Sequence, residues 1–314
     1  MFAPDSARLT AEPAGPRTAP THDPLLAAVG STPLVPLRSI AGADGYELWA
    51  KVESRNPTGS VKDRAALAIV RDAFARGELE GGRTLVDATS GNSGVAYAML
   101  GARLGFPVLL FVPANANPER LRALRAFGAE VELTDPAEGT DGAQEVARRR
   151  VAADPSRYYF ADQYRNPANP AAHYAGTGPE VWRQSAGRLT HFVAGVGTGG
   201  TISGAGRFLK ERNPAIRVVG VEPTGPLHGL EGLKHLPTAV VPRTYDPSVV
   251  DETVRVDTEE AIAMVERLGA HEGLRAGRSA GAAVVAAVRL GKGHPGSFVV
   301  VVLADAGEPS GGSR

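Results

Sequence analysis

Short apolar runs alternate with longer segments of helical periodicity along most of the chain. The apolar runs are rich in branched residues and predict strands over Thr84–Asp87, Val108–Val112, Val131–Leu133, Tyr158–Ala161, Phe192–Ala194, Val218–Val221 and Phe298–Leu303. Most of them show no alternation of apolar and polar positions, which is typical of strands covered on both faces. Apolar positions three and four residues apart predict helices over Ser93–Leu104, Glu119–Phe127, Gln144–Ala152, Ile202–Glu211 and Glu259–Leu268. This order of elements predicts an α/β fold with twisted, mostly parallel sheets covered by helices.

The composition fits a chain with a large hydrophobic core. Of 314 residues, 43% are hydrophobic and 22% are charged, which leaves room for two domains. The 34 basic residues balance 34 acidic ones, so no net charge favours nucleic acid or an anionic membrane, and we expect a small ligand. The absence of cysteine excludes disulfides and thiolate metal sites, and no apolar run has the length of a signal peptide or membrane span. We therefore expect a cytoplasmic enzyme without a metal site. Residues 1–23, rich in Pro, Ala and Thr, predict a mobile extension.

The first candidate for chemistry is Lys62, which stands in the segment NPTGSVKDR where a loop gives way to a helix. Behind it, Ala66, Ile69 and Val70 belong to an apolar stripe that would pack this helix against the core and so anchor the lysine. The alternative is an ordinary solvent-exposed lysine at the start of a helix. Lys62 therefore requires support from other features.

The second feature is the segment TSGNSG, Thr89–Gly94, between the strand TLVD and the helix SGVAYAML. A turn rich in hydroxyls and glycine at a helix N-terminus presents unpaired backbone N–H groups, which suit a carboxylate. The alternative is plain N-capping of the helix by Ser90 or Asn92. The loop is longer than a cap requires, and its glycines allow a ligand to approach the backbone closely.

The third feature is a glycine-rich loop between a predicted strand and a predicted helix. Gly195, Gly197 and Gly200 satisfy G-x-G-x-x-G, and a further strand ends at Glu222. By itself this pattern indicates a dinucleotide site, in which Glu222 would bind the ribose of a nicotinamide cofactor.

The sequence GTGGT within this loop also favours a different ligand. Gly199 adds another glycine, and Thr198 and Thr201 place hydroxyl donors around the turn. These groups suit a terminal phosphate monoester better than a shared pyrophosphate. A dinucleotide enzyme would also leave Lys62 and the segment TSGNSG without a role.

Pyridoxal phosphate would use all of these features, because its aldehyde condenses with a lysine, its phosphate needs a cradle, and its amino-acid substrate needs a carboxylate site. At this point the chain resembles the cysteine synthases of the tryptophan-synthase-β class, the fold type II pyridoxal-phosphate enzymes. The resemblance runs from about VGSTPLVPL to VVLADAGE. It rests on motifs in the family's order and approximate spacing, namely NPTGSVKDR, TSGNSG, DQYRNPANP, GTGPE, GVGTGGT, VVGVEP and GRSAGAA.

The resemblance implies roles for individual residues. Lys62 would hold the cofactor covalently and act as the catalytic acid–base, and Asn92 would hydrogen-bond the phenolic oxygen of the cofactor. The phosphate would lie in a cradle of Gly197, Thr198, Gly199, Gly200 and Thr201. The substrate carboxylate would be bound by Thr89, Ser90, Asn92, Ser93 and Gln163. Ser279 would face the pyridine nitrogen, although capping of the helix AGAAVVAAV is its structural alternative.

The implied reaction is the synthesis of cysteine. An O-activated L-serine, O-acetylserine or O-phosphoserine, would lose acetate or phosphate and accept sulfur from sulfide, thiosulfate or a carrier thiocarboxylate. The segment GLEGLKHLPTAVVPRTYD resembles the B type of cysteine synthase, in which an arginine at the position of Lys234 often meets an anionic substrate. Lys234 would then bind substrate phosphate or a sulfur donor, with a solvated loop lysine as the alternative.

The resemblance also implies an architecture and partners. The smaller α/β domain would span residues 51–160, and the larger would take residues 24–50, with early strands crossing over, and 161–314. The enzyme would be a homodimer, and a sulfur-carrier protein would be a candidate partner. Two departures from the family pattern are Arg278, beside Ser279, and the carboxylate of Asp305 near the expected ring. Cystathionine β-synthase, a serine/threonine deaminase-type lyase and a non-catalytic protein of the same fold remain open as alternatives.

Overall fold

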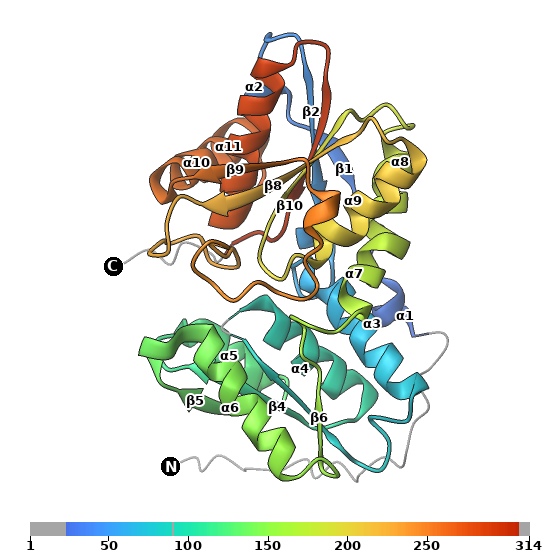
Figure 1. The fold of residues 1–314 in the computed structure, drawn as a ribbon, viewed down its shortest axis with the longest axis vertical. Coiled ribbons are helices and arrows are strands. Elements are labelled where there is room, and N and C mark those ends of the chain that lie inside the picture. Colours follow the sequence, from blue (N-terminus) through green and yellow to red (C-terminus); the bar gives the residue numbers. More distant parts are fainter. Residues whose placement is uncertain (1–22, 90, 308–314) are drawn as a thin grey trace, which may run out of the picture.

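Two sheets, one above the other, organise the molecule (Figure 1). The computed structural model describes residues 23–89 and 91–307. The larger sheet has six strands in the order β1-β2-β10-β7-β8-β9, and the smaller has four in the order β5-β4-β3-β6. All pairings are parallel except that of β1 with β2. The predicted fold class is confirmed.

Every strand and helix predicted from the apolar pattern is present. The predicted strands are β3 (Thr84–Ala88), β4 (Val108–Pro113), β5 (Glu130–Thr134), β6 (Tyr158–Phe160), β7 (His191–Gly195), β8 (Arg217–Pro223) and β10 (Phe298–Leu303). The predicted helices are α4 (Asn92–Leu104), α5 (Pro118–Ala126), α6 (Gly139–Ala153), α9 (Gly200–Arg212) and α10 (Thr258–Glu272), together with α3 (Lys62–Ala75) behind the candidate lysine. Helix α6 begins at Gly139, before the predicted start at Gln144. The apolar pattern did not detect its first turn, GTDG, because that turn contains no large apolar residue.

The apolar pattern did not identify three strands of the larger sheet. These are β1 (Leu34–Pro36), β2 (Glu47–Val52) and β9 (Glu252–Val256). Strand β9 lies at the edge of the larger sheet beside β8 and alternates half-buried with exposed residues up to the buried Val256, so it carries charged side chains rather than an apolar run. In strand β2 the fully buried Lys51 precedes the last residue, and its charge interrupts the apolar run. The strand extends to Val52, past the domain boundary at residue 50 that the resemblance implies.

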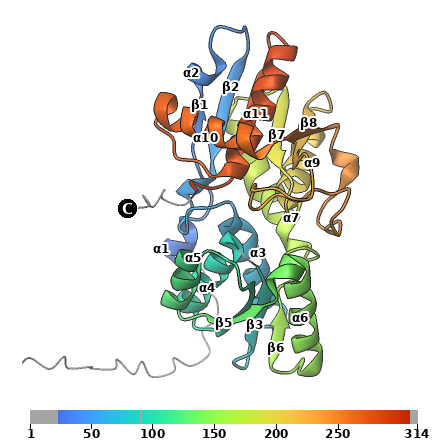
Figure 2. The same ribbon diagram turned by 90° about the vertical axis from the view of Figure 1, so that its left-hand side faces the viewer.

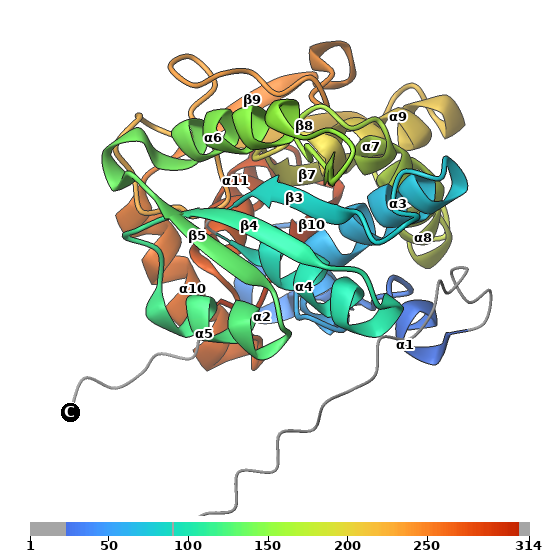
Figure 3. The same ribbon diagram turned by 90° about the horizontal axis from the view of Figure 1, so that it is seen from below.

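Helices cover both faces of each sheet. On the larger sheet, α2 (Arg38–Ala41), α10 and α11 (Arg278–Gly293) pack on one face, whereas α8 (Gly178–Gln184) and α9 pack on the other (Figure 2). On the smaller sheet, α3, α4 and α5 cover one face and α6 covers the other (Figure 3). Strands enclosed in this way can be apolar throughout, as the continuous runs predicted.

The remaining short elements connect the two parts of the molecule. Helix α1 (Pro24–Ala27) is capped by Asp23, the last residue of the predicted extension, whereas residues 1–22 lie outside the described part of the chain. Helix α7 (Ala168–Ala172) continues into a π-helical turn over His173–Thr177 and then into α8. None of the helices that the structure describes has the length and apolarity needed to cross a membrane.

Candidate active site

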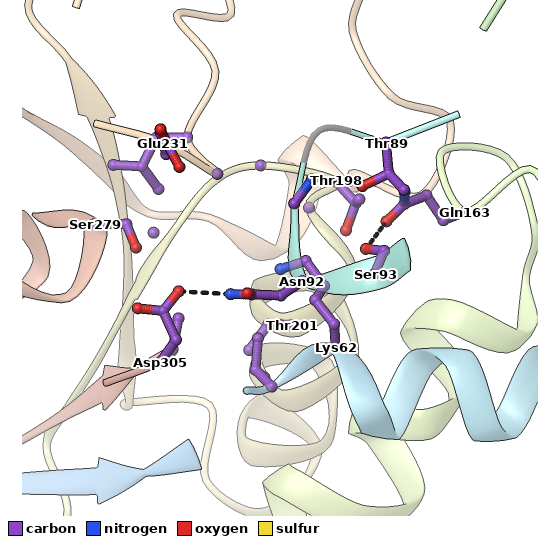
Figure 4. Close-up of a pocket in the computed structure, with 18 of the residues that line it drawn as sticks. Lys62, Thr89, Asn92, Ser93, Gln163, Thr198, Thr201, Glu231, Ser279 and Asp305 are labelled. Carbon is purple, nitrogen blue, oxygen red and sulfur yellow. Dashed lines mark hydrogen bonds between the residues drawn. The ribbon is translucent and has the colours of Figure 1, made fainter. Parts of the chain in front are cut away.

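A pocket (Figure 4) lies between the two sheets, where β3, β7 and β10 come to their carboxyl ends. In open parallel sheets this edge is where ligands bind. Most of the predicted site residues line this pocket, namely Lys62, Thr89, Asn92, Ser93, Gln163, Gly197, Thr198, Gly199, Thr201 and Ser279. Gly200 and Lys234 do not line it, and Ser90 lies outside the described residues.

Lys62 is the first residue of α3, and both its backbone and its helix are held in place. The apolar stripe of α3, which includes Ala66, Ile69 and Val70, packs in the core of the smaller sheet. The preceding loop joins the end of β10, since the Val61 N–H donates to the carbonyl of Ala304 at 2.8 Å. Lys62 is therefore fixed at the point where the two sheets meet.

The amine of Lys62 makes no hydrogen bond or ion pair with any residue that the structure describes. Burial lowers the pKa of Lys62 below its ordinary value, and the charge of Asp305 partly opposes this shift. A lysine of this kind has a larger neutral fraction at physiological pH than an exposed one. Its amine is thus suited to act as a nucleophile or a base.

The N-terminus of α4 is open toward the pocket. Its N-cap is Gly91, and no side chain of the described residues caps the helix. Asn92 is the first residue of the helix and not its N-cap, whereas the other capping candidate, Ser90, lies outside the described residues. The Thr89 hydroxyl oxygen accepts from the Gly91 N–H at 3.0 Å, which leaves its own hydrogen available. Ser93 donates to Gln163 Oε1 at 2.6 Å, so the amide hydrogens of Gln163 remain available. These donors and the helix dipole suit a carboxylate.

The glycine-rich loop adopts a shape that depends on its glycines. Gly199 has φ 81° and forms the N-cap of α9, where no side chain caps the helix. A Cβ on Gly197 would lie 2.0 Å from the carbonyl oxygen of Gly232. The loop can therefore wrap tightly around the start of α9 while Thr198 and Thr201 line the pocket.

Ser279 lies at the start of a third helix, on the opposite wall of the pocket. Helix α11 is capped by Gly277, so Ser279 is not its N-cap, which corrects the structural alternative. Its hydroxyl makes no hydrogen bond with any residue in the described part of the chain, although the residue is only 6% exposed. A polar group buried against a pocket without a partner is suited to a ligand.

Asp305 follows β10 and reaches across to Asn92. Its Oδ2 accepts from Asn92 Nδ2 at 2.8 Å (Figure 4), and its Oδ1 accepts from the Gly307 N–H at 2.9 Å. Arg278 does not pair with Asp305, because its guanidinium approaches the carbonyl of Gly229 at 3.5 Å instead. The carboxylate thus lies between Asn92 and the α11 wall.

Two other residues singled out in the sequence do not reach the pocket. Glu222 is buried in β8, where burial raises its pKa, and it does not line the pocket, so the nicotinamide hypothesis loses its ribose ligand. The Lys234 amine pairs with Asp141 at 2.8 Å and lies 5.1 Å from the centre of the Tyr164 ring.

No pattern in the sequence indicated that Arg120 and Glu231 line the pocket. Arg120, on α5, pairs with Glu231 at 3.1 Å, so this pair crosses from the smaller sheet to the loop after β8. Lys234 and Asp141 form a second ion pair between the loop after β8 and the helices of the smaller sheet, since Asp141 belongs to α6. Residues separated this far along the chain leave no local pattern.

Comparisons with known proteins agree on one family. The family model described as "Pyridoxal-phosphate dependent enzyme" matches residues 25–305. A cysteine synthase of Aquifex aeolicus is 48% identical over 91% of this chain and 90% of its own length, and cysteine synthase B of Salmonella typhimurium is 41% identical over 89% and 91%. The crystal structure of cysteine synthase from Entamoeba histolytica superposes with a TM-score of 0.86 at 32% identity, covering 95% of this chain and 91% of its own.

Proposed function

The chain belongs to the family of pyridoxal-phosphate dependent enzymes, and we propose that it is a cysteine synthase, which replaces the acetate or phosphate of an O-activated L-serine with sulfur. One observation carries the proposal. Four segments that are distant in sequence bring an unpaired lysine amine, a hydroxyl-rich glycine loop, an open helix N-terminus and an unpaired serine hydroxyl into one pocket.

The residues of the pocket fit pyridoxal phosphate. The unpaired Lys62 amine is available for its aldehyde, and the loop of Gly197, Thr198, Gly199, Gly200 and Thr201 offers donors for its phosphate. The Ser279 hydroxyl, which has no partner among the described residues, is available for its pyridine nitrogen. Asn92 Nδ2 gives one hydrogen to Asp305 and has a second one for the phenolic oxygen. When bound, the cofactor would supply an electron sink that stabilises negative charge at the substrate α-carbon.

The N-terminus of α4 would hold the substrate carboxylate. Thr89 and Ser93 flank the open turn, and Gln163 has amide hydrogens left to donate because Ser93 occupies its oxygen. The first-turn N–H groups of Asn92 and Ser93 would add backbone donors. These contacts would orient the substrate so that its α-proton faces Lys62.

Lys62 would move that proton. Because burial lowers the pKa of Lys62, its free amine has a larger neutral fraction than that of an exposed lysine. This amine can accept the α-proton before the leaving group departs from the β-carbon. After sulfur has added at the β-carbon, the same ammonium group can return the proton. Ser279 carries no charge and would not keep the pyridine nitrogen of the cofactor protonated. The cofactor would then withdraw electrons less strongly, which favours β-replacement over transamination.

The choice of substrate remains a prediction from the resemblance. Lys234 is our candidate for binding the phosphate of O-phosphoserine or an anionic sulfur donor, but its amine would first have to leave Asp141. Replacing Lys234 with Ala and comparing O-acetylserine with O-phosphoserine tests this role. A loss confined to O-phosphoserine would support it, whereas equal losses on both esters would contradict it.

The main experiment compares the wild-type protein with Lys62→Ala. We expect the purified wild type to show the visible absorbance of lysine-bound pyridoxal phosphate, to change that absorbance on addition of one of the two esters, and to form cysteine with sulfide. Lys62→Ala should lose all three, whereas Lys292→Ala, at a lysine whose side chain is 59% exposed, should keep them. A Lys62→Ala variant with wild-type activity would refute the proposal.

The same assay separates the alternatives. A cystathionine β-synthase would accept homocysteine, a deaminase-type lyase would release ammonia and a keto acid without a sulfur donor, and a non-catalytic protein would leave the absorbance unchanged with either ester. The homodimer and the sulfur-carrier protein remain predictions from the resemblance, and the cytoplasmic location remains a prediction from the composition. Sedimentation of the purified protein tests the homodimer.

A further inference from the structure

A helical segment lies directly beneath the glycine-rich loop. Helix α7 and the π-helical turn that follows it pack against the first turns of α9 (Figure 1). The packing is close, because a Cβ on Gly204 would lie 2.0 Å from the carbonyl oxygen of Pro170 and 2.9 Å from the Cβ of His173. A Cβ on Gly200 would lie 2.0 Å from Asn169 Oδ1. Side chains of this segment therefore reach the loop directly.

Asn169 fixes the direction of the Thr198 hydroxyl. Asn169 Nδ2 donates to the carbonyl oxygen of Gln163 at 2.8 Å, and because a carbonyl cannot donate, the amide nitrogen must face it. The same nitrogen donates to Thr198 Oγ1 at 3.1 Å, and the Gly200 N–H also donates to that oxygen at 3.3 Å. With both lone pairs of Thr198 Oγ1 occupied, its hydrogen is left for another acceptor.

His173, one helical turn after Asn169, contacts the second threonine of the loop. Its Nε2 lies 3.3 Å from Thr201 Oγ1 and its Nδ1 lies 2.9 Å from Thr177 Oγ1. The residue is 2% exposed. Burial and then the nearby charges of Arg64 and Lys62 hold its pKa well below 6.5, against the opposing charge of Glu180.

A neutral imidazole donates through one nitrogen and accepts through the other. When Nε2 carries the hydrogen, it donates to Thr201 Oγ1 and leaves the hydroxyl hydrogen of Thr201 available. In the other tautomer, Thr201 gives its hydrogen to His173 and has none for a ligand. An anionic phosphate in the loop accepts but does not donate, so it selects the first arrangement.

We propose that Asn169 and His173 are positioning residues that orient the Thr198 and Thr201 hydroxyls, so that both threonines donate to the phosphate of the cofactor. This inference rests on the proposed function, since it assigns the loop to pyridoxal phosphate. The two side chains are four residues apart, on one face of the helical segment, and each holds one of the two threonines that line the pocket. Neither residue touches the pocket itself.

The test compares two ligands that differ only in the phosphate group. Cofactor-free wild type and variants are titrated with pyridoxal phosphate and with pyridoxal, and binding is followed by absorbance. His173→Asn removes the group facing Thr201, whereas the side-chain amide of His173→Gln can reach the Nε2 position and donate. We expect His173→Asn to weaken pyridoxal phosphate about tenfold, the usual effect of losing a hydrogen bond to a charged group. Binding of pyridoxal should be unchanged, and His173→Gln should recover most of the loss.

A second variant tests Asn169 and guards against misfolding. Asn169→Asp keeps the shape but turns a donor into an acceptor, so the carboxylate would take the hydrogen of Thr198, and pyridoxal phosphate should again be weakened selectively. Phosphorus NMR of the bound cofactor should show a shifted resonance in both weakened variants.

Each outcome decides between the hypotheses. Equal losses for both ligands, or no loss for either, would overturn the positioning role while leaving the proposed function intact. So would a His173→Gln variant that binds no better than His173→Asn. If the wild type binds neither ligand through Lys62, the proposed function and this inference are both wrong.

Discussion

A buried group of charges behind the active-site lysine gives the sharpest stability prediction. Glu180 on α8 accepts from Lys51 at 2.6 Å and from Arg64, two residues after Lys62, at 2.7 and 2.8 Å. Arg64 also pairs with Glu53 at 2.6 Å. The Lys51 side chain is fully buried and the Glu180 side chain is 10% exposed. This group ties α3 to strand β2 and helix α8 of the larger sheet.

We predict that Glu180→Gln destabilises the protein by about 3 kcal/mol or more, because Lys51 would remain buried without its carboxylate. Two estimates agree. Removing one partner of a buried ion pair typically costs about 3–5 kcal/mol. Burial alone would raise the pKa of Glu180, but hydrogen bonds and charges from Arg64 and Lys51 outweigh it and lower the pKa from 4.5 to about 2. That shift corresponds to about 3 kcal/mol of stability at neutral pH.

The sign of the pH dependence provides a further check. Since the pKa of Glu180 is lower in the folded state, its contribution is present above about pH 4.5 and is lost as the pH falls toward about 2. The difference between wild type and Glu180→Gln should therefore shrink over this range.

Urea unfolding of the cofactor-free proteins measures the loss. Glu145→Gln is the matched control, because that side chain is 57% exposed and pairs with Arg148 at 3.3 Å. It should cost less than about 0.5 kcal/mol. A loss below about 1 kcal/mol for Glu180→Gln, or a difference from wild type that stays constant down to acid pH, would refute the reasoning.

The remaining predictions concern packing and pH. Gly101→Ala in α4 would place a Cβ 2.5 Å from Val108 Cγ2 and should cost about 1–3 kcal/mol. Gly269→Ala in α10 has no atom within 4 Å and should stabilise by about 0.5–1 kcal/mol, so thermal melting that ranks them in reverse would contradict the packing argument. Burial raises the pKa of Asp87 from 3.8 to about 7, so its contribution to stability falls as the pH rises between these values. Asp87→Asn should therefore be less harmful at pH 8 than at pH 4, measured by urea unfolding, and the opposite order would exclude a buried protonated carboxyl.

Periodicity along the chain predicted the elements that it could encode locally. The continuous apolar runs of β4 and β10 identified strands enclosed by helices, because burial on both faces removes the polar alternation. Strands β2 and β9 were not identified, since Lys51 is compensated by Glu180 from a distant helix and β9 carries charges at the sheet edge. Such compensation depends on neighbours that the local pattern does not contain.

The site was partly predictable for a related reason. The sequence by itself determined the chemical groups and their local settings: a lysine at a helix start, hydroxyls and glycines at helix N-termini, and the absence of thiols. Only the tertiary structure decided which groups meet, because Gln163, Ser279 and Asp305 reach the pocket of Lys62 through the crossovers between strands. It also paired Lys234 with Asp141 and set His173 and Asn169 beneath the threonines of the loop. Hydrogen bonds and ion pairs act over a few ångströms in space, whatever the separation along the chain, so their partners follow from packing.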